Sequence, residues 1–466
     1  MVFSSLLFLL IFLPVTVGIY FLLPKKAQNY WLLVVSLVFY AWGEPAHIFI
    51  MLITTAFLWV MGLCVAHFQS KDRPGLSKFF LVLSLVFSLS ILMFFKYTGF
   101  LVSNLPFLAD TGIADIVPAL PIGISFYTFQ ALSYIIDVYR GDVKAQKNWG
   151  YFTMYISLFP QLIAGPIVRY SDVAAQIETR EASFPKMAKG LQRFTLGLGK
   201  KVLLANQIGI VWETLSQSNT VLGAWVAAIA FAFQIYFDFS AYSDMAIGLG
   251  NLFGFDFTEN FRYPYESSSI TDFWRRWHMT LGTWFREYVY IPLGGNRKGL
   301  PRQVLNLLIV WFLTGFWHGA AWQFILWGLY YFLFLCMEKL FLLKLLKKLP
   351  GWVRHVYALV VVVLGWVLFA CADVAAAGNL YKAMFGIGVA FADKTALFTL
   401  VSSVLLLIIC AVGATEFPQK AAARLEQAWG EKKFSYLRYG VIALVLLLSL
   451  AFLVADSYNP FLYFRF

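Results

Sequence analysis

The segment Phe79–Phe95 reads FFLVLSLVFSLSILMFF and contains no charged residue, although Lys78 and Lys96 lie directly on either side of it. An α-helix needs about 18 to 20 apolar residues to cross the hydrocarbon core of a bilayer, and this run is close to that length. Comparable runs recur along the chain, at Val2–Leu23, Ile48–Val65, Val353–Ala370, Ala396–Val412 and Tyr439–Val454. The sequence therefore predicts an all-α polytopic membrane protein.

The composition agrees with this fold class. Of the 466 residues, 61% are hydrophobic and 13% are charged, and a soluble domain of this size carries about twice that charged fraction. No polar stretch is long enough for a separate globular domain. We therefore expect one integral-membrane domain over residues 1–466, with its motifs at about 120–335 and peripheral helices over 1–100 and 350–466. The first segment lacks the basic start and small-residue cleavage site of a signal peptide, so a retained helix is expected.

The net charge of +12 indicates cytoplasmic loops, where basic residues of membrane proteins collect, and not a nucleic-acid partner. Counting these residues loop by loop predicts that both termini lie outside, and it places the basic stretch 169–201 in the cytoplasm. The four cysteines are isolated within apolar runs, so they are expected to be buried and inert. They are Cys64, Cys336, Cys371 and Cys410.

Two central segments break the pattern of spanning helices. Tyr151–Val168 contains Pro160, Gly165 and Pro166, and irregular backbone at membrane depth is tolerated where protein buries it, so a re-entrant segment is predicted. Phe261–Tyr290 is too charged to face lipid. It is expected to form helices at the interface or dipping into the protein, and it is followed by the turn GGNRKG.

Two histidines stand in tryptophan-rich surroundings within apolar sequence. His278 belongs to SITDFWRRWHMTLGTWFREYVYIPLGGNR and His318 to VWFLTGFWHGAAWQFILWG. An ionisable side chain at membrane depth costs roughly 2.5–3.5 kcal/mol on insertion scales, so it persists mainly where it lines a polar cavity or performs chemistry. The alternatives are an amphipathic interface helix with snorkelling arginines for the first segment and a simple hydrogen-bonded core histidine for the second.

Helical spacing suggests which residues accompany each histidine. Arg275, Gly282 and Arg286 fall on the predicted face of His278, which could receive an anionic group or stabilise an oxyanion. Small residues beside His318 (Gly315, Gly319) are expected to leave room for a slender group.

A third polar set lies in the segment 232–255, AFQIYFDFSAYSDMAIGLGNLFGF. Its members share or adjoin one helical face, and they are Gln234, Asp238, Tyr242, Ser243 and Asp244. The two carboxylates need partners, and Arg275, Arg276 or the histidines are expected to supply them. A purely structural ion pair is the alternative. Metalloprotease, hydrolase, ATPase and dinucleotide-binding motifs do not occur.

Six motifs together resemble the membrane-bound O-acyltransferase (MBOAT) family, of the bacterial alginate O-acetyltransferase type. They are MVFSSLLFLLIFLP, LPIGISFYTFQALSYIIDVYRGD, LFPQLIAGPIVRY, QIYFDFSAYSDMAIGLGNLFGF, ENFRYPYESSSITDFWRRWHMTLGTWFREYVYIPLGGNR and GFWHGAAWQFILWGLY. The resemblance extends from the amino terminus to about residue 335, and beyond residue 340 only apolar helices are shared.

The resemblance implies a ring of about 11–13 transmembrane helices with re-entrant or interfacial helices and a central tunnel. It matches the family's invariant histidine to His318 and its second histidine to His278. It further implies a bacterial inner-membrane enzyme that takes acetyl from cytoplasmic acetyl-CoA and has no tightly bound cofactor or metal. The acetyl group would cross to an extracytoplasmic acetyltransferase partner for O-acetylation of an exported polysaccharide or cell-wall glycan. The LGGNR turn favours the acetyl-transferring branch over D-alanylation.

The working hypothesis makes His318 the general base for a hydroxyl. His278, with Arg275 or Arg276, would orient the substrates and offset charge, and Asp238 or Asp244 would hold one imidazole in the useful tautomer. An acyl-histidine intermediate and direct transfer both remain open. The remaining substrate-binding candidates are Gln234, Tyr242, Ser243, Trp277 and Trp317. The alternatives are a lipid-linked glycan flippase or small-solute transporter, and a non-catalytic scaffold.

Overall fold

The computed structural model describes the whole chain except residues 110–111, 113–116, 456–460 and 463–466. The regular elements of the described residues are helices, with a single isolated β-bridge. The chain divides into two compact units. The first comprises Met1–Phe194 and Ser243–Glu259, and the second comprises Thr195–Tyr242 and Asn260–Phe466.

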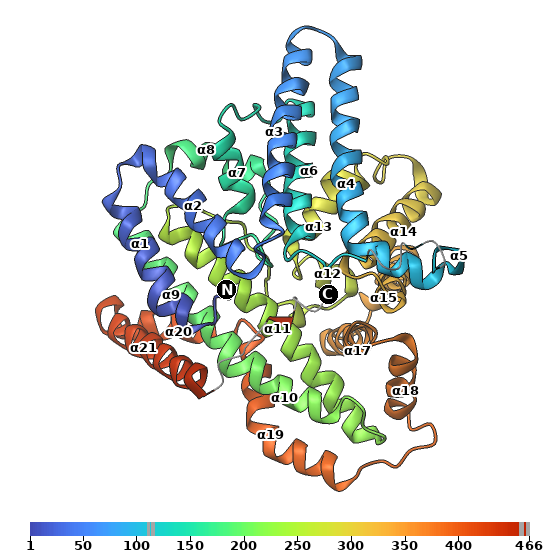
Figure 1. The fold of residues 1–466 in the computed structure, drawn as a ribbon. Coiled ribbons are helices and arrows are strands. Elements are labelled where there is room, and N and C mark those ends of the chain that lie inside the picture. The colour runs from blue at the N-terminus through green and yellow to red at the C-terminus, as the bar shows by residue number, and fades with distance from the viewer. Residues whose placement is uncertain (110–111, 113–116, 456–460, 463–466) are drawn as a thin grey trace. The chain divides into compact units, whose positions relative to one another are not determined.

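The first unit is built around a helical hairpin. Its helices are η1 (Phe8–Phe12), α1 (Leu13–Leu22), α2 (Lys25–Gly43), α3 (Ile48–Ser70), α4 (Pro74–Asn104), α5 (Pro106–Ala109), α6 (Ile124–Arg140), α7 (Trp149–Ser157), α8 (Tyr170–Thr179) and most of α9 (Phe184–Gly199). Helices α3 and α4 form the hairpin, and α6 packs against both (Figure 1). The turn between α3 and α4 contains Asp72 at a positive φ of 51°. Pro74 starts α4, at a position where the N–H that proline lacks would have no partner within the helix.

The predicted irregular segment is confirmed. Helix α7 ends at Ser157, and the chain has no regular helix again until Tyr170. Almost all side chains of residues 158–168 are buried. Gly123, at φ +77°, lies directly against this segment, because a Cβ there would stand 2.6 Å from the carbonyl oxygen of Leu162.

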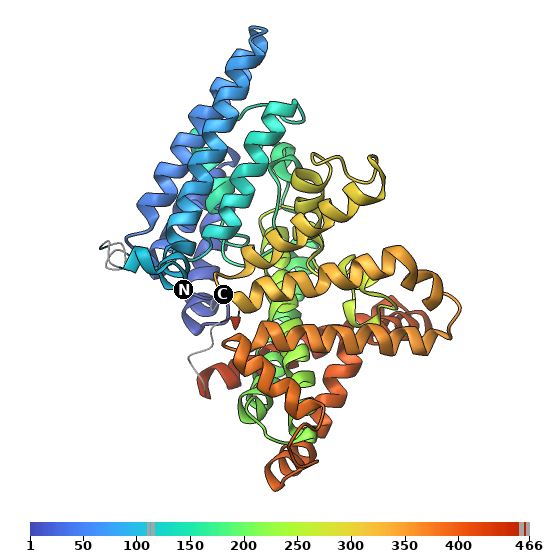
Figure 2. The same cartoon turned by 90° about the vertical axis from the view of Figure 1, so that its right-hand side faces the viewer.

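The second unit contains the segments that carry both histidines. Its helices are η3 (Lys200–Ala205), α10 (Asn206–Leu215), the part of α11 (Val221–Leu252) up to Tyr242, η4 (Pro264–Glu266), α12 (Ile270–Trp274), α13 (Met279–Phe285), η5 (Arg286–Tyr290), α14 (Gly299–His318), α15 (Trp322–Met337), η6 (Glu338–Leu342), α16 (Leu343–Leu346), α17 (Gly351–Ala370), α18 (Val374–Met384), α19 (Lys394–Gly413), α20 (Phe417–Trp429) and α21 (Glu431–Ala455). Helix α15 packs against both α14 and α17, and these helices carry the yellow to orange colours of Figure 2.

The membrane character of the chain is confirmed. By length and composition, seven of the described helices could cross a membrane, and they are α3, α4, α11, α14, α17, α19 and α21. The segment Phe261–Tyr290 contributes none of them and forms several short helices. Its predicted place at the interface or within the protein stays a prediction. The expected count of 11–13 spans, the ring, the tunnel and the placement of the termini stay predictions. All four cysteines are free, and two of them, Cys336 and Cys410, are buried.

Helices α14 and α15 approach closely because each presents a glycine to the other. A Cβ on Gly315 would lie 2.3 Å from the carbonyl oxygen of Phe324, and a Cβ on Gly328 would lie 2.3 Å from that of Trp311. Small residues of this kind let helix backbones meet in membrane proteins. This contact corrects the expectation that Gly315 and Gly319 leave room beside His318. Helix α15 occupies the space at Gly315, and the ring of Phe324 fills the space at Gly319.

Replacing Gly328 by alanine is therefore expected to destabilise the protein, although alanine favours helices over glycine. Overpacking of this kind typically costs about 1–3 kcal/mol. A Cβ on Gly440, in helix α21, would have no atom of another residue within 4 Å, so Gly440→Ala is the matched control. Thermal unfolding of the detergent-purified variants measures the difference. Equal melting temperatures for the two variants would contradict the close contact.

Candidate functional site: two buried imidazoles

His278 lies between two short helices and not within one long helix. Helix α12 ends at Trp274, and His278 is the N-cap of α13 with a left-handed φ of +44° and ψ of 53°. Such a backbone is uncommon for residues other than glycine and occurs often at functional sites. The predicted continuous face through Arg275, His278, Gly282 and Arg286 is therefore wrong for Arg275, because the helix breaks after Trp274.

Asn260 fixes the orientation and the protonation of His278. The Asn260 Oδ1 atom accepts hydrogen bonds from the backbone N–H and the hydroxyl of Thr280, at 3.3 and 2.9 Å. It lies 3.0 Å from Nδ1 of His278. Because this oxygen can only accept, Nδ1 must carry the proton. The Nε2 atom of the neutral ring then offers a lone pair, and it is buried with no hydrogen-bond partner among the described residues.

His318 shows the same arrangement at the end of α14. Its Nδ1 atom lies 2.7 Å from the carbonyl oxygen of Thr314, one turn earlier. A carbonyl oxygen can only accept, so the proton again sits on Nδ1 and leaves Nε2 as the basic atom. Both rings are therefore held in the tautomer that a general base requires. The predicted role of Asp238 or Asp244 in setting a tautomer is wrong, because a neutral oxygen does this for each ring.

Trp317 lies close to both imidazoles. Its ring centroid is 6.3 Å from that of His278 and 5.0 Å from that of His318. The side chain of His278 is 2% exposed and that of His318 is 6% exposed. Burial lowers the pKa of His278 well below its ordinary value of 6.5, and the nearby His318 adds to this effect. His278 is therefore a neutral ring at physiological pH.

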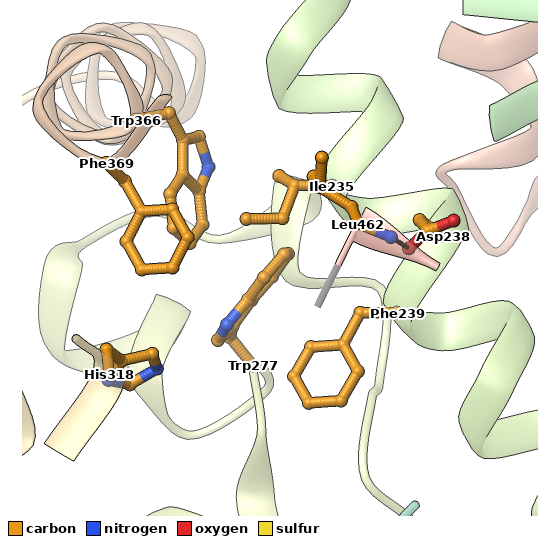
Figure 3. Close-up of a pocket in the computed structure, with 8 residues that line it drawn as sticks. All are labelled: Ile235, Asp238, Phe239, Trp277, His318, Trp366, Phe369 and Leu462. Atoms are coloured by element: carbon orange, nitrogen blue, oxygen red, sulfur yellow. Dashed lines mark hydrogen bonds between the residues drawn. The ribbon is translucent and has the colours of Figure 1, made fainter. Parts of the chain in front are cut away.

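Two cavities reach the histidines, and Trp277 borders both. The larger has a volume of about 200 Å³ and extends from His278 and Gly282 to Arg286 and Tyr290. On its other side α14 supplies Leu307, Val310, Trp311 and Thr314. The smaller cavity, of about 10 Å³, lies at His318 and is drawn in Figure 3. Helix α17 contributes Trp366 and Phe369 to it, and Asp238 and Leu462 also line it.

The arginines predicted to accompany His278 lie in different surroundings. Arg275 is exposed, and Arg276 pairs with Asp272 at 3.1 Å. Neither residue lines either cavity, whereas Arg286 lines the larger one. Helical spacing therefore correctly grouped Arg286 with His278, while the helix break after Trp274 separated Arg275 from this face.

Asp238 pairs with Lys201, which corrects the expectation of an arginine or histidine partner. Both side chains are 4% exposed, so the ion pair is almost completely buried. The second carboxylate oxygen of Asp238 accepts the backbone N–H of Leu462 at 2.8 Å. Sequence reasoning missed Lys201 because it ends a basic stretch that was interpreted as cytoplasmic. Removing one partner of such a buried pair is strongly destabilising, by about 3–5 kcal/mol.

The structure shows other neighbours for Gln234, Tyr242 and Asp244 of the α11 motif. Gln234 packs against Gly209 of α10, and Tyr242 is buried against Phe461 at a centroid distance of 4.8 Å. Ser243 and Asp244 belong to the first unit, where Asp244 pairs with Arg193 at 2.9 Å. Their predicted substrate contacts stay predictions. Within the described part of the chain, no three His, Cys, Asp or Glu side chains form a group that could hold a metal ion.

Glu338 anchors the helix that precedes His278. This carboxylate is 1% exposed and accepts the backbone N–H groups of Ile270 and Thr271 at 2.6 and 2.8 Å. It also accepts the hydroxyls of Thr271 and Tyr357, at 2.6 and 3.1 Å. The charge therefore satisfies the free donors at the start of α12 and ties α12 to α17. The signal that could have revealed it is an acidic residue directly after the apolar run Trp322–Met337.

Comparison with known proteins places both histidines in a matched region. Residues 147–375 match the model of the membrane-bound O-acyltransferase family. The chain is 39% identical to a probable alginate O-acetylase of Pseudomonas putida, over 100% of both chains. It is 30% identical to a peptidoglycan O-acetyltransferase of Helicobacter pylori, over 100% of this chain and 98% of the relative. A teichoic acid D-alanyltransferase of Bacillus subtilis is 29% identical over 45% of this chain and 56% of the relative.

The neutral state of His278 predicts how stability depends on pH. Below about pH 6.5 the unfolded chain protonates this ring while the folded protein does not, so the free energy of unfolding decreases as the pH falls. Asparagine tolerates the left-handed backbone and keeps a donor toward Asn260, but it does not titrate. His278→Asn should therefore lose less thermal stability than the unmodified protein between pH 7.5 and pH 5.5. An equal or larger loss in this variant would show that His278 is not held neutral.

Proposed function

The chain belongs to the membrane-bound O-acyltransferase family, and we propose that it transfers an acetyl group from cytoplasmic acetyl-CoA for O-acetylation of an exported polysaccharide or cell-wall glycan. It is an O-acyltransferase and a multi-pass membrane protein. The observation that carries the mechanism is that Nδ1 of each imidazole lies within hydrogen-bond distance of an oxygen that can only accept. This contact puts a proton on Nδ1 and makes Nε2 the basic atom of each neutral ring. A flippase or scaffold would not need this arrangement.

In the proposed reaction His318 is the general base. A hydroxyl oxygen of the acceptor attacks the thioester carbonyl carbon, and its proton passes to Nε2 of His318. The tetrahedral intermediate then collapses, the carbon–sulfur bond breaks, and the imidazolium returns the proton to the departing thiolate. His278 carries no proton on its Nε2, so at this nitrogen it can accept a hydrogen bond, from a hydroxyl or an amide N–H of a substrate. Direct transfer needs no group beyond these side chains.

The larger cavity is the proposed site of the donor's pantetheine arm. Its walls are mostly apolar and aromatic, it begins at His278, and it ends at Arg286 and Tyr290. The side chain of Arg286 is 70% exposed, so its guanidinium is accessible to the phosphates of coenzyme A. Arg297, Lys298 and Arg302 follow closely in the sequence. Arginine is well suited to phosphate because it donates two parallel hydrogen bonds.

The relatives' names support the proposed acceptor and its location. Alginate and peptidoglycan are glycans found outside the cytoplasm, so we propose that this chain lies in the bacterial inner membrane. We propose that an extracytoplasmic acetyltransferase partner receives the acetyl group on that side. Incorporation of labelled acetate into surface glycans of cells that carry or lack this chain tests the acceptor.

Replacing His318 by alanine should reduce acetyl transfer by about 100- to 10,000-fold, the usual contribution of a general base. Release of free CoA from acetyl-CoA in the presence of acceptor measures the rate. His67→Ala, at an exposed histidine at the end of α3, is the control and should retain full activity. Both variants should insert and remain folded, although His318→Ala should unfold at a lower temperature because it removes a buried ring. Undiminished transfer by His318→Ala would contradict the proposed role of His318 as the general base.

Replacing Arg286 by glutamine should raise the KM for acetyl-CoA about tenfold or more, because a hydrogen bond to a charged group contributes about 1.5–3 kcal/mol. The KM for S-acetyl-pantetheine, which lacks the nucleotide phosphates, should hardly change. Arg275→Gln, at an arginine that lines neither cavity, is the matched control. An equal change for both donors, or a larger effect at Arg275, would contradict the assignment of this cavity.

A further inference from the structure

The space around His318 is almost completely filled by aromatic rings. The imidazole centroid lies 4.9 Å from the ring of Trp327 and 5.5 Å from that of Phe369. The adjoining cavity measures about 10 Å³, which is room for about one water molecule. Figure 3 shows Phe369, Trp366 and Trp277 arranged around it, with His318 at one end. The proposed base therefore faces a very small chamber.

The aromatic wall is held rigidly. Trp366 lies 4.7 Å from Trp277 and 5.6 Å from Phe369, measured between ring centroids. Phe369 in turn packs at 5.1 Å against Phe324 and at 5.2 Å against Trp327. Trp366 is 1% exposed and Phe369 is 2% exposed. Neither ring can turn aside without displacing a buried neighbour, and closely packed interiors resist such changes.

Helix α17, which lies beyond the six motifs found in the sequence, supplies two of these three rings. Its residues Trp366 and Phe369 stand one turn apart and face the cavity together. Phe324 and Trp327 of helix α15 pack against these two rings. Two of the three rings therefore belong to a helix for which the sequence predicts no function.

We propose that Phe369, together with Trp366 and Trp277, limits the acyl group that can react at His318 to two carbons. This inference rests on the proposed acyl transfer from a coenzyme A thioester and adds the residues that select its acyl chain. An acetyl group places only a methyl beyond the carbonyl carbon. Each further methylene must enter space that the aromatic rings occupy. Discrimination of one methylene is typically about 10- to 200-fold in an enzyme pocket.

The test compares acetyl-CoA, propionyl-CoA and butyryl-CoA as donors for the full-length protein in detergent or nanodiscs. The unmodified protein should prefer acetyl-CoA over propionyl-CoA by at least about tenfold in kcat/KM. Phe369→Ala should raise the ratio of propionyl to acetyl transfer about tenfold or more, and Phe369→Leu should raise it less. Phe334→Ala is the matched control, because Phe334 packs against Tyr330 at 4.8 Å and lines neither cavity.

The outcomes separate the inference from the proposed function. If the unmodified protein uses no coenzyme A thioester, the proposed donor is wrong, and the proposed limit on acyl length is wrong with it. If it transfers acetyl but uses butyryl-CoA equally well, only the proposed limit on acyl length is contradicted. An unchanged ratio of propionyl to acetyl transfer in folded Phe369→Ala and Phe369→Leu contradicts the same proposal and leaves the proposed function intact. Should Phe369→Ala unfold, Phe369→Leu and Trp366→Phe give the same comparison with smaller losses of volume.

Discussion

The hydrogen bonds from Nδ1 of each imidazole to an oxygen that can only accept are the interactions on which the proposed chemistry depends. For His318 the oxygen is the Thr314 carbonyl within the same helix, at 2.7 Å. For His278 it is the amide oxygen of Asn260, itself fixed by two donors from Thr280. Each bond places the proton on Nδ1 and leaves the basic nitrogen toward the aromatic interior. Reversing either tautomer would leave a proton where the base must receive one.

The rest of the second unit positions these two rings and keeps water from them. The glycine contact between α14 and α15 brings Trp327 and Phe324 close to His318, and α17 adds Trp366 and Phe369. The buried carboxylate of Glu338 fixes the start of α12, so that Trp277 and His278 follow at a defined place. Electrostatic interactions are stronger where water is excluded, so oriented dipoles at this site would interact strongly with a charge that develops during the reaction.

Helical spacing predicted part of the site and failed at identifiable points. It grouped Gly282 and Arg286 with His278, because all three lie along α13 and its continuation. It misplaced Arg275, because the left-handed backbone at His278 ends the helical phase. It expected open space at Gly315 and Gly319, yet glycine marks a close contact as readily as a gap, and α15 fills both positions. It assigned Asp238 to an arginine or a histidine, since nothing local reveals that Lys201 is buried beside it.

The sequence by itself determined the fold class and the family, and it identified the two histidines as candidate site residues. It could do so because apolar runs, charge distribution and ordered motifs are local properties of the chain. It also placed tryptophans next to both histidines in the chain. Only the tertiary structure decided which oxygen holds each imidazole, which cation neutralises Asp238 and which helix closes the chamber at His318. Most of these depend on contacts between residues distant in sequence, such as Asp238 with Lys201 or Phe369 with His318. The contact of His318 with Thr314 is the exception, because it lies within one helix. Periodicity within one segment carries no information about the surface of another.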